Sequence, residues 1–73
     1  MTFTLYVAED CHQCAQVSQW VKENTEVSIL NVDLDGAKPP IPTFIFPALF
    51  QNDGLKAYGE DIIPILKRNL GVA

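Results

Sequence analysis

The sequence predicts an α/β fold with the element order β-α-β-β-β-α. Three observations lead to this order: apolar and polar residues alternate near the N-terminus, apolar residues recur at helical spacing in two separate segments, and turn-forming residues separate several short apolar runs. A chain of 73 residues is long enough for one hydrophobic core. We therefore expect residues 1–73 to form a single domain.

The first half of the chain predicts a strand, a helix and a second strand. Apolar and polar residues alternate over residues 3–7, as they do in a half-buried strand. The aliphatic and β-branched run at residues 27–32 predicts the second strand, which ends at the turn-forming residues 33–36. Between them, helical spacing extends to about Asn24, and the apolar face of this helix carries Cys14, Val17 and Val21.

The second half of the chain predicts a hairpin followed by a helix. The apolar residues 44–46 are strand-like, and Pro47 is expected to mark a bulge in this third strand or its end, because proline cannot donate to a central ladder. The turn signal at residues 51–54 predicts a hairpin whose second arm is residues 55–58. After Gly59, helical spacing predicts the last helix, with its apolar face formed by Ile62, Ile63, Leu66 and Leu70.

The composition is that of a globular protein with a negative surface. Apolar residues make up 48% of the chain, charged residues make up 19%, and the net charge is -4. Nucleic acids and anionic membranes attract concentrated lysine and arginine, and the chain has only five such residues, so we expect neither as a partner. The N-terminal segment lacks the pattern of a signal peptide, and no run approaches the roughly 20 apolar residues that span a bilayer. We expect a cytoplasmic protein.

Cys11 and Cys14 form a C-x-x-C motif between the first predicted strand and the first predicted helix. In a reducing cytosol, a close cysteine pair indicates transient redox chemistry or metal binding. The N–H groups at a helix N-terminus favour a thiolate. We therefore predict that Cys11, the more exposed residue, is the nucleophile and that Cys14, which lies deeper, is the resolving cysteine.

The side chains next to the pair are expected to tune the reactivity of Cys11. A protonated His12 would lower the pKa of the Cys11 thiol, whereas the carboxylates of Glu9 and Asp10 would raise it. Gln13, between the two cysteines, is the other candidate for tuning. We expect a moderately lowered pKa for this thiol.

Metal binding is the alternative function of the motif, because the same spacing supplies two ligands to zinc and copper sites. The chain has no second cysteine pair, and His12 lies between the cysteines rather than at ligand spacing. A four-ligand zinc site would therefore need a partner chain. An inert structural pair is disfavoured by its position at a helix start. We expect a redox-active disulfide with no metal and no bound cofactor, and a soft-metal carrier is the alternative.

The residues around the motif resemble the thioredoxin superfamily, and the glutaredoxins in particular. Tyr6 lies five residues before Cys11, as at the start of glutaredoxins, and Gly59 matches the glycine before their last helix. The Cys-x-Gln-Cys pattern and the Asn-Val-Asp run at residues 31–33 are similar to the NrdH-redoxins, which donate electrons to ribonucleotide reductase. The resemblance implies a thioredoxin-like mixed four-stranded sheet and an oxidoreductase that reduces protein disulfides through a mixed disulfide.

A proline segment further along the chain completes the resemblance. Ile41, Pro42 and Thr43 are similar to the thioredoxin segment in which a cis-proline faces the dithiol. The resemblance implies that Pro42 is the cis-proline and that the backbone of Ile41 pairs with substrate, while Thr43 and Tyr6 are further substrate-binding residues. A stiff linker with every proline trans is the alternative. Ala8 stands where glutaredoxins often have a basic residue that assists glutathione, so glutathione and thioredoxin reductase remain alternative reductants.

The connection between the second and third predicted strands is too short for the helix that the family has there. Only about seven residues precede Pro42 in this connection, and the segment is rich in proline, so the usual second helix is expected to be missing. The exposed sheet face must then be polar, shielded by residues 47–50, or buried by another molecule. We expect an apolar patch near Tyr6, Leu49 and Phe50 to support weak self-association or partner docking.

Overall fold

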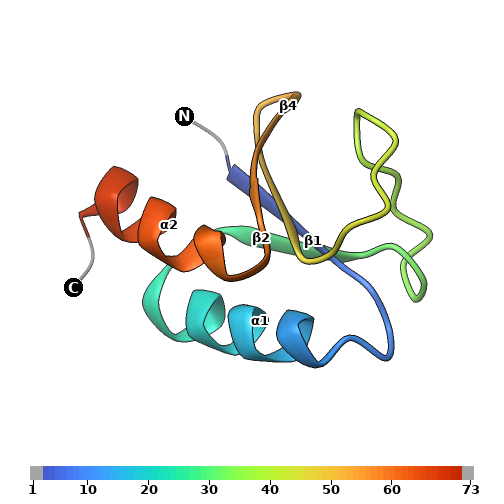
Figure 1. Ribbon diagram of the computed structural model, residues 1–73, viewed down its shortest axis with the longest axis horizontal. Helices are drawn as coiled ribbons and strands as arrows, with labels where there is room; N and C mark the ends of the chain where they lie inside the picture. The colour runs from blue at the N-terminus through green and yellow to red at the C-terminus, as the bar shows by residue number, and fades with distance from the viewer. Residues whose placement is uncertain (1–2, 72–73) are drawn as a thin grey trace.

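The computed structural model describes residues 3–71 and confirms the predicted order of elements (Figure 1). The described elements are β1 (Phe3–Val7), α1 (His12–Asn24), β2 (Ser28–Asn31), β3 (Ala48–Gln51), β4 (Gly54–Tyr58), the short 3-10 helix η1 (Gly59–Asp61) and α2 (Ile62–Leu70). The α/β fold class is as predicted, and no helix separates β2 from β3. Within residues 3–71, neither α-helix has the length and apolar character needed to cross a membrane.

The strands form one mixed sheet in the order β2-β1-β3-β4. β1 is parallel to β2 and antiparallel to β3, and β3 is antiparallel to β4. In this register, Leu5 of β1 lies between Ile29 of β2 and Leu49 of β3. Because β1 and β2 are parallel, their carboxyl ends meet at the same edge of the sheet. The loop before α1 and the loop after β2 therefore start side by side.

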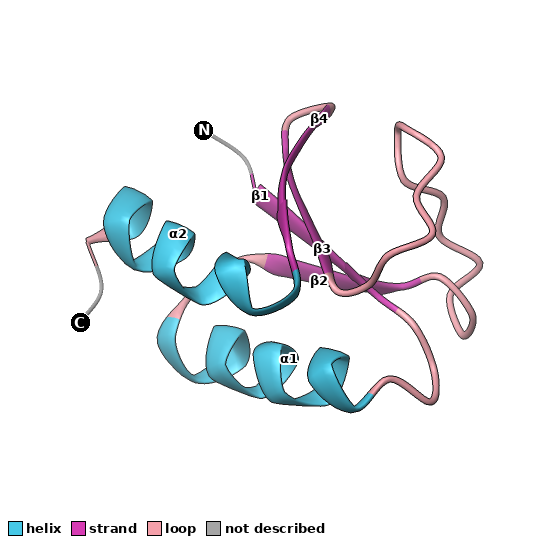
Figure 2. Ribbon diagram, viewed as in Figure 1, coloured by secondary structure: helices cyan, strands magenta, loops and turns pink. Residues whose placement is uncertain are grey.

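Both α-helices pack against the same face of the sheet (Figure 2). Alternate residues of β1 point toward this face, where they meet the apolar stripe of α1 and the buried side of α2. The resulting core contains the buried residues Phe3, Leu5, Val7, Cys14, Val17, Val21, Leu49, Ile62 and Leu66. The second cysteine of the motif is thus a core residue.

The opposite face of the sheet is covered by the long loop between β2 and β3. Tyr6 and Phe50 lie edge to face on this side, with their ring centroids 5.4 Å apart. Val32, Ala37 and Phe46 of the loop pack against the cluster that these two rings form with β3. The loop therefore supplies the second layer that a helix would otherwise provide.

The prediction of an exposed apolar patch near Tyr6, Leu49 and Phe50 is wrong, because these side chains are buried. Their exposed fractions are 8%, 0% and 0%. Neighbours along a strand point to opposite faces, so Leu49 faces the helices while Phe50 faces the loop. Most of the expected shield at residues 47–50 is part of β3 itself.

The third strand begins four residues later than the sequence pattern predicts. Phe44 is 93% exposed, and Pro47 precedes β3 instead of ending it. The hairpin sets this register, because Gln51 pairs with Gly54 across the turn and the residues just before the turn must form the partner strand. The predicted second arm of the hairpin is confirmed as β4.

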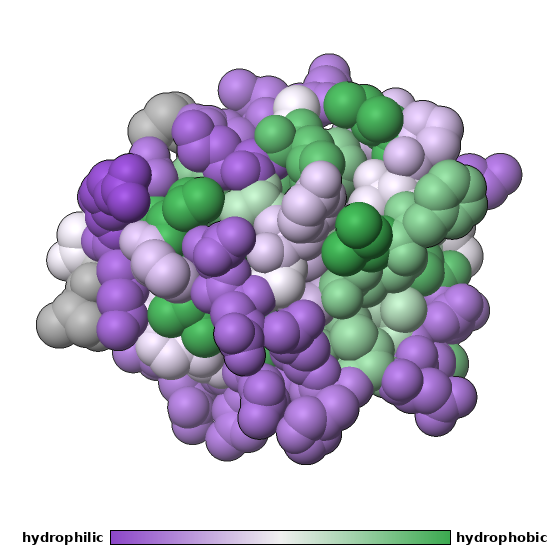
Figure 3. Space-filling model, viewed as in Figure 1, coloured by the Kyte–Doolittle hydropathy of each residue, from purple (hydrophilic) through white to green (hydrophobic). Residues whose placement is uncertain are grey.

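Apolar side chains also reach the surface on the side of the long loop (Figure 3). Leu34, Ile41, Phe44 and Ile45 are 72%, 46%, 93% and 55% exposed, respectively. The loop therefore presents two kinds of apolar residue. One set covers the sheet, and the other faces outward.

Candidate functional site

Cys11 and Cys14 are joined by a disulfide at the start of α1. Cys11 is the N-cap residue, with an extended backbone (φ -122°, ψ 102°), and its Sγ accepts a hydrogen bond from the Cys14 N–H at 3.1 Å. The side chain of Cys14 is 3% exposed, whereas that of Cys11 is only partly buried. Cys11 is therefore the more exposed of the two cysteines, as the sequence predicts.

The first turn of α1 places positive partial charge next to the Cys11 sulfur. The N–H groups at a helix start have no partner within the helix, and the Cys14 N–H points at this sulfur. The first turn of α1 contains no acidic residue. In the reduced protein, the same N–H and the helix dipole would stabilise a thiolate at Cys11.

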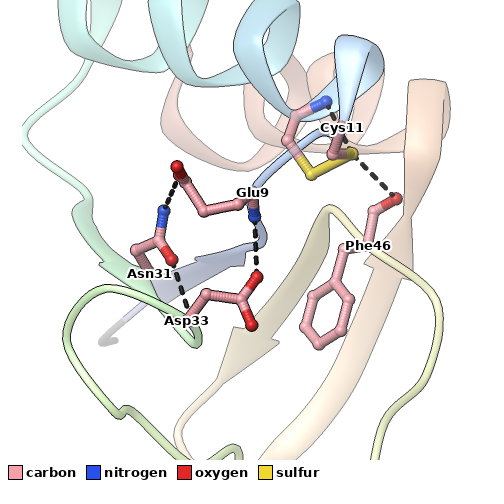
Figure 4. The surroundings of a disulfide bond; sticks show 6 residues. Glu9, Cys11, Asn31, Asp33 and Phe46 are labelled. Carbon is pink, nitrogen blue, oxygen red and sulfur yellow. Dashed lines mark hydrogen bonds between the residues drawn. A yellow bond between two sulfur atoms is a disulfide. The ribbon is translucent and has the colours of Figure 1, made fainter.

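A hydrogen-bonded clamp holds the loop that leads from β1 into α1 (Figure 4). Asn31 Nδ2 donates to Glu9 Oε2 at 2.9 Å, and the Glu9 N–H donates to Asp33 Oδ2 at 2.8 Å. Asn31 Oδ1 accepts hydrogen bonds from the N–H groups of Asp33 and Leu34, both at 2.9 Å. Asp10, the next residue in the loop, has φ 53°, a left-handed conformation that aspartate adopts more readily than most residues. We call Glu9, Asn31 and Asp33 the Asn31 clamp.

Sequence reasoning identifies the Asn-Val-Asp run at residues 31–33 by resemblance alone and assigns it no contact. The structure shows that this run joins the loop after β2 to the loop before α1. A second carboxylate reinforces the turn, because Asp35 Oδ2 accepts a hydrogen bond from the Asn31 N–H at 2.9 Å. Asparagine and aspartate just after a strand are typical of turns closed by side chains, and this is the signal that could have found the clamp.

The cis-proline in the described chain is Pro47, so the prediction of a cis bond at Pro42 is wrong. The Phe46–Pro47 bond leads directly into β3, and the Phe46 carbonyl oxygen lies 3.7 Å from Cys11 Sγ. The Pro47 carbonyl accepts a hydrogen bond from the Gly59 N–H at 2.9 Å. Pro42 lies in the exposed part of the loop because β3 begins later than the sequence pattern predicts.

The other predicted substrate-binding residues also lie away from the disulfide. Pro42 and Thr43 line a shallow depression of about 210 Å³ together with side chains of β4. The Ile41 carbonyl accepts a hydrogen bond from Thr43 Oγ1 at 2.9 Å. Tyr6 lies under the long loop against Phe50. None of the four predicted side chains lines the hollow beside the disulfide.

The two predicted tuning residues differ in their surroundings. His12 is exposed at the first position of α1, whereas Gln13 is partly buried. Gly59 has φ 65°, and a Cβ at this position would come within 3.4 Å of the Gln13 side-chain oxygen. Gln13 therefore fills the space between α1 and the start of η1, while His12 remains open to solvent.

A hollow of about 360 Å³ opens beside the disulfide. Both cysteines line it, together with the carboxylates of Glu9, Asp10 and Asp35 and with Lys22 as a cation. Negative charge therefore predominates in the hollow, in keeping with the net charge of -4. Such a hollow attracts basic segments of other molecules and repels acidic ones.

The cysteine pair has no further metal-ligating side chains grouped with it in the described part of the chain. Among residues 3–71, no group of three or more His, Cys, Asp or Glu side chains is placed to hold a metal ion. The two sulfurs are bonded to each other. A four-ligand zinc site would need side chains from a second molecule.

Comparison of the chain with known proteins finds no relative. No protein-family model matches it, and no curated protein or solved structure matches it. The function is therefore inferred from the residues of the site and their geometry.

Proposed function

We propose that this protein is a small thiol–disulfide oxidoreductase, similar to glutaredoxins and NrdH-redoxins, that reduces disulfides in other proteins. The observation that carries the proposal is the Cys11–Cys14 disulfide across the first turn of α1, with Cys11 partly exposed and Cys14 in the core. A disulfide that closes so short a loop restricts the unfolded chain little, so it contributes little to stability. Its accessible position at a helix start is typical of redox-active cysteines.

Cys11 acts as the nucleophile in this proposal. The Cys14 N–H and the helix dipole lower the pKa of the Cys11 thiol below the value of about 8.5 for a free cysteine. Glu9 and Asp10 oppose this shift, and the Phe46 carbonyl also opposes it because it can accept a hydrogen bond from the neutral thiol. We expect a moderately lowered pKa and a substantial thiolate fraction at neutral pH.

The reaction proceeds through two exchanges. The Cys11 thiolate attacks one sulfur of the substrate disulfide, forming a mixed disulfide and releasing the other substrate sulfur as a thiolate, which takes up a proton. Cys14, as its thiolate, then attacks the Cys11 sulfur, forming the Cys11–Cys14 disulfide and releasing the second substrate thiolate. Two electrons pass from the cysteine pair to the substrate. An external thiol or a reductase returns the protein to its dithiol form.

Two features next to Cys11 support a protein as the substrate. The Phe46 carbonyl lies beside the sulfur, so the main chain of a bound segment can pair there, in the role that the resemblance gives to Ile41. The acidic hollow on the other side favours substrates with basic residues near their disulfide. In its most specific form, the proposal names ribonucleotide reductase as the protein whose disulfide is reduced. The reductant is either glutathione or thioredoxin reductase. Ala8 lacks the positive charge that assists glutathione in glutaredoxins, so the resemblance does not select glutathione.

The reduction of insulin by dithiothreitol tests the proposal. The wild-type protein is expected to accelerate the precipitation of the insulin B chain, and Cys11→Ser is expected to lose this acceleration because it has no attacking thiolate. Gln16→Ala is the matched control, since it changes an exposed residue of the same helix and leaves the motif intact. A folded wild-type protein that is no faster than dithiothreitol alone would overturn the proposal.

A further inference from the structure

The Asn31 side chain uses both ends of its amide at the edge of the candidate site. Its Nδ2 donates to Glu9 Oε2 at 2.9 Å, while its Oδ1 accepts from the N–H groups of Asp33 and Leu34. An aspartate could accept but not donate, and a serine is too short to do both across the same span. Asparagine at this position therefore has a contact that turn formation alone does not explain.

Glu9 is held at two points. Its N–H donates to Asp33 Oδ2 at 2.8 Å, and its carboxylate accepts from Asn31 Nδ2. Figure 4 shows the Glu9 side chain extending toward Asn31 and away from the Cys11 sulfur. Glu9 and Cys11 nevertheless line the same hollow of about 360 Å³, so a released Glu9 side chain has open space next to Cys11.

We propose that Asn31 is a positioning residue that holds the Glu9 carboxylate on the β2 side of the loop, away from the Cys11 sulfur. The inference rests on the proposed function, because it concerns the nucleophile of that reaction. A carboxylate near the sulfur disfavours the thiolate, and two residues of separation along the chain allow Glu9 to come close. The clamp thus limits how much the acidic residue Glu9 destabilises the Cys11 thiolate.

The substitution Asn31→Ala leaves the other charged residues around Cys11 unchanged in identity. Asp10, Asp35 and Lys22 share the hollow with Cys11, and His12 is the next residue on α1. On the β3 side, the group that faces the sulfur is the Phe46 carbonyl. Asp33 loses a hydrogen bond to its N–H in an Asn31 variant but keeps its own bond to the Glu9 N–H. A comparison between two backgrounds that differ only at Glu9 therefore isolates the effect of the Glu9 charge.

The test is a double-mutant cycle of wild type, Asn31→Ala, Glu9→Gln and the double variant. For each reduced protein, the rate of Cys11 alkylation by iodoacetamide is measured against pH, and the modified residue is identified by peptide mass. We expect Asn31→Ala to raise the apparent pKa of the Cys11 thiol by about 0.3 to 0.6 of a unit, which slows alkylation about two- to fourfold below that pKa. In the Glu9→Gln background, the same substitution is expected to leave this pKa unchanged.

An equal pKa shift in both backgrounds would overturn the inference, because it would mean that Asn31 acts by shaping the loop and not through the Glu9 charge. The absence of any shift would overturn it as well. Urea unfolding of the four proteins separates stability from reactivity, since the lost acceptor for the Asp33 and Leu34 N–H groups lowers stability equally in both backgrounds. If the wild type reduces insulin but Asn31→Ala shifts the pKa equally, or not at all, in the two backgrounds, only the inference about Asn31 is rejected. If the wild type fails to reduce insulin, the proposed function itself is rejected.

Discussion

Replacing Phe50 with alanine is expected to lower the free energy of unfolding by about 3–5 kcal/mol. The Phe50 side chain is fully buried between β3 and the long loop, where it meets Tyr6 edge to face at 5.4 Å. Removing the ring leaves a cavity under a loop that has no regular structure of its own. Because small proteins have stabilities of only about 5–15 kcal/mol, this loss is a large fraction of the total.

Phe44→Ala is the matched control for this prediction. It makes the same chemical change in the long loop that precedes β3, where the Phe44 side chain is 93% exposed. We expect it to change stability by less than about 0.5 kcal/mol. Urea unfolding of both variants with the disulfide intact measures the difference. A loss below about 1 kcal/mol for Phe50→Ala would contradict the conclusion that the loop closes the second face of the sheet.

Cys14→Ser is expected to stop turnover after the first exchange. Cys14 lies one turn from Cys11 and is held against it by the fold, so its attack on the mixed disulfide is intramolecular. Without it, resolution depends on an external thiol at millimolar concentration, and we expect insulin reduction to fall at least about 100-fold. The Cys11 mixed disulfide should accumulate and appear by non-reducing electrophoresis and mass spectrometry.

Cys11→Ser distinguishes the roles of the two sulfurs in the same assay. Its remaining thiol, Cys14, is 3% exposed, so it is expected to form no mixed disulfide with insulin. If Cys11→Ser forms the adduct as readily as Cys14→Ser does, the division into nucleophile and resolving cysteine is wrong.

The order of elements and the position of the disulfide could be predicted from the sequence because both depend on local patterns. Alternation at residues 3–7 and helical spacing around Cys14 and Val17 record which faces are buried, and the structure buries those faces. The turn at residues 51–54 fixes the hairpin in the same way. Because Cys11 comes directly before the first helical residue, the order of elements also predicts that it lies at the helix start, where it is the N-cap.

The loop between β2 and β3 was harder to predict because its structure depends on contacts between residues far apart in the sequence. Phe44, Ile45 and Phe46 form an apolar run, yet the hairpin register assigns strand pairing to the residues after Pro47. Of this run, Phe46 packs against the buried cluster with Phe50, whereas Phe44 and Ile45 are exposed. Because β3 begins later than predicted, the cis-proline is Pro47, whose preceding residue Phe46 contacts Cys11, and not the predicted Pro42. No local pattern around either proline indicates this difference.

The contacts of the Asn31 clamp depend on two loops that the sequence separates. Asn31 and Glu9 are 22 residues apart, and they meet because β1 and β2 are parallel and end at the same edge of the sheet. Sequence reasoning placed both residues near strand ends. The hydrogen bond between them follows only once the sheet order and register are known.

Electron transfer from the reduced protein to insulin, with no other reductant present, tests the central claim most directly. An excess of the dithiol form is mixed with insulin, the reaction is quenched with acid, and free thiols in both proteins are counted by alkylation and mass spectrometry. We predict that one Cys11–Cys14 disulfide forms for each insulin disulfide that disappears. If insulin keeps its disulfides while Cys11 and Cys14 stay reduced in a folded protein, the proposal of thiol–disulfide exchange is contradicted.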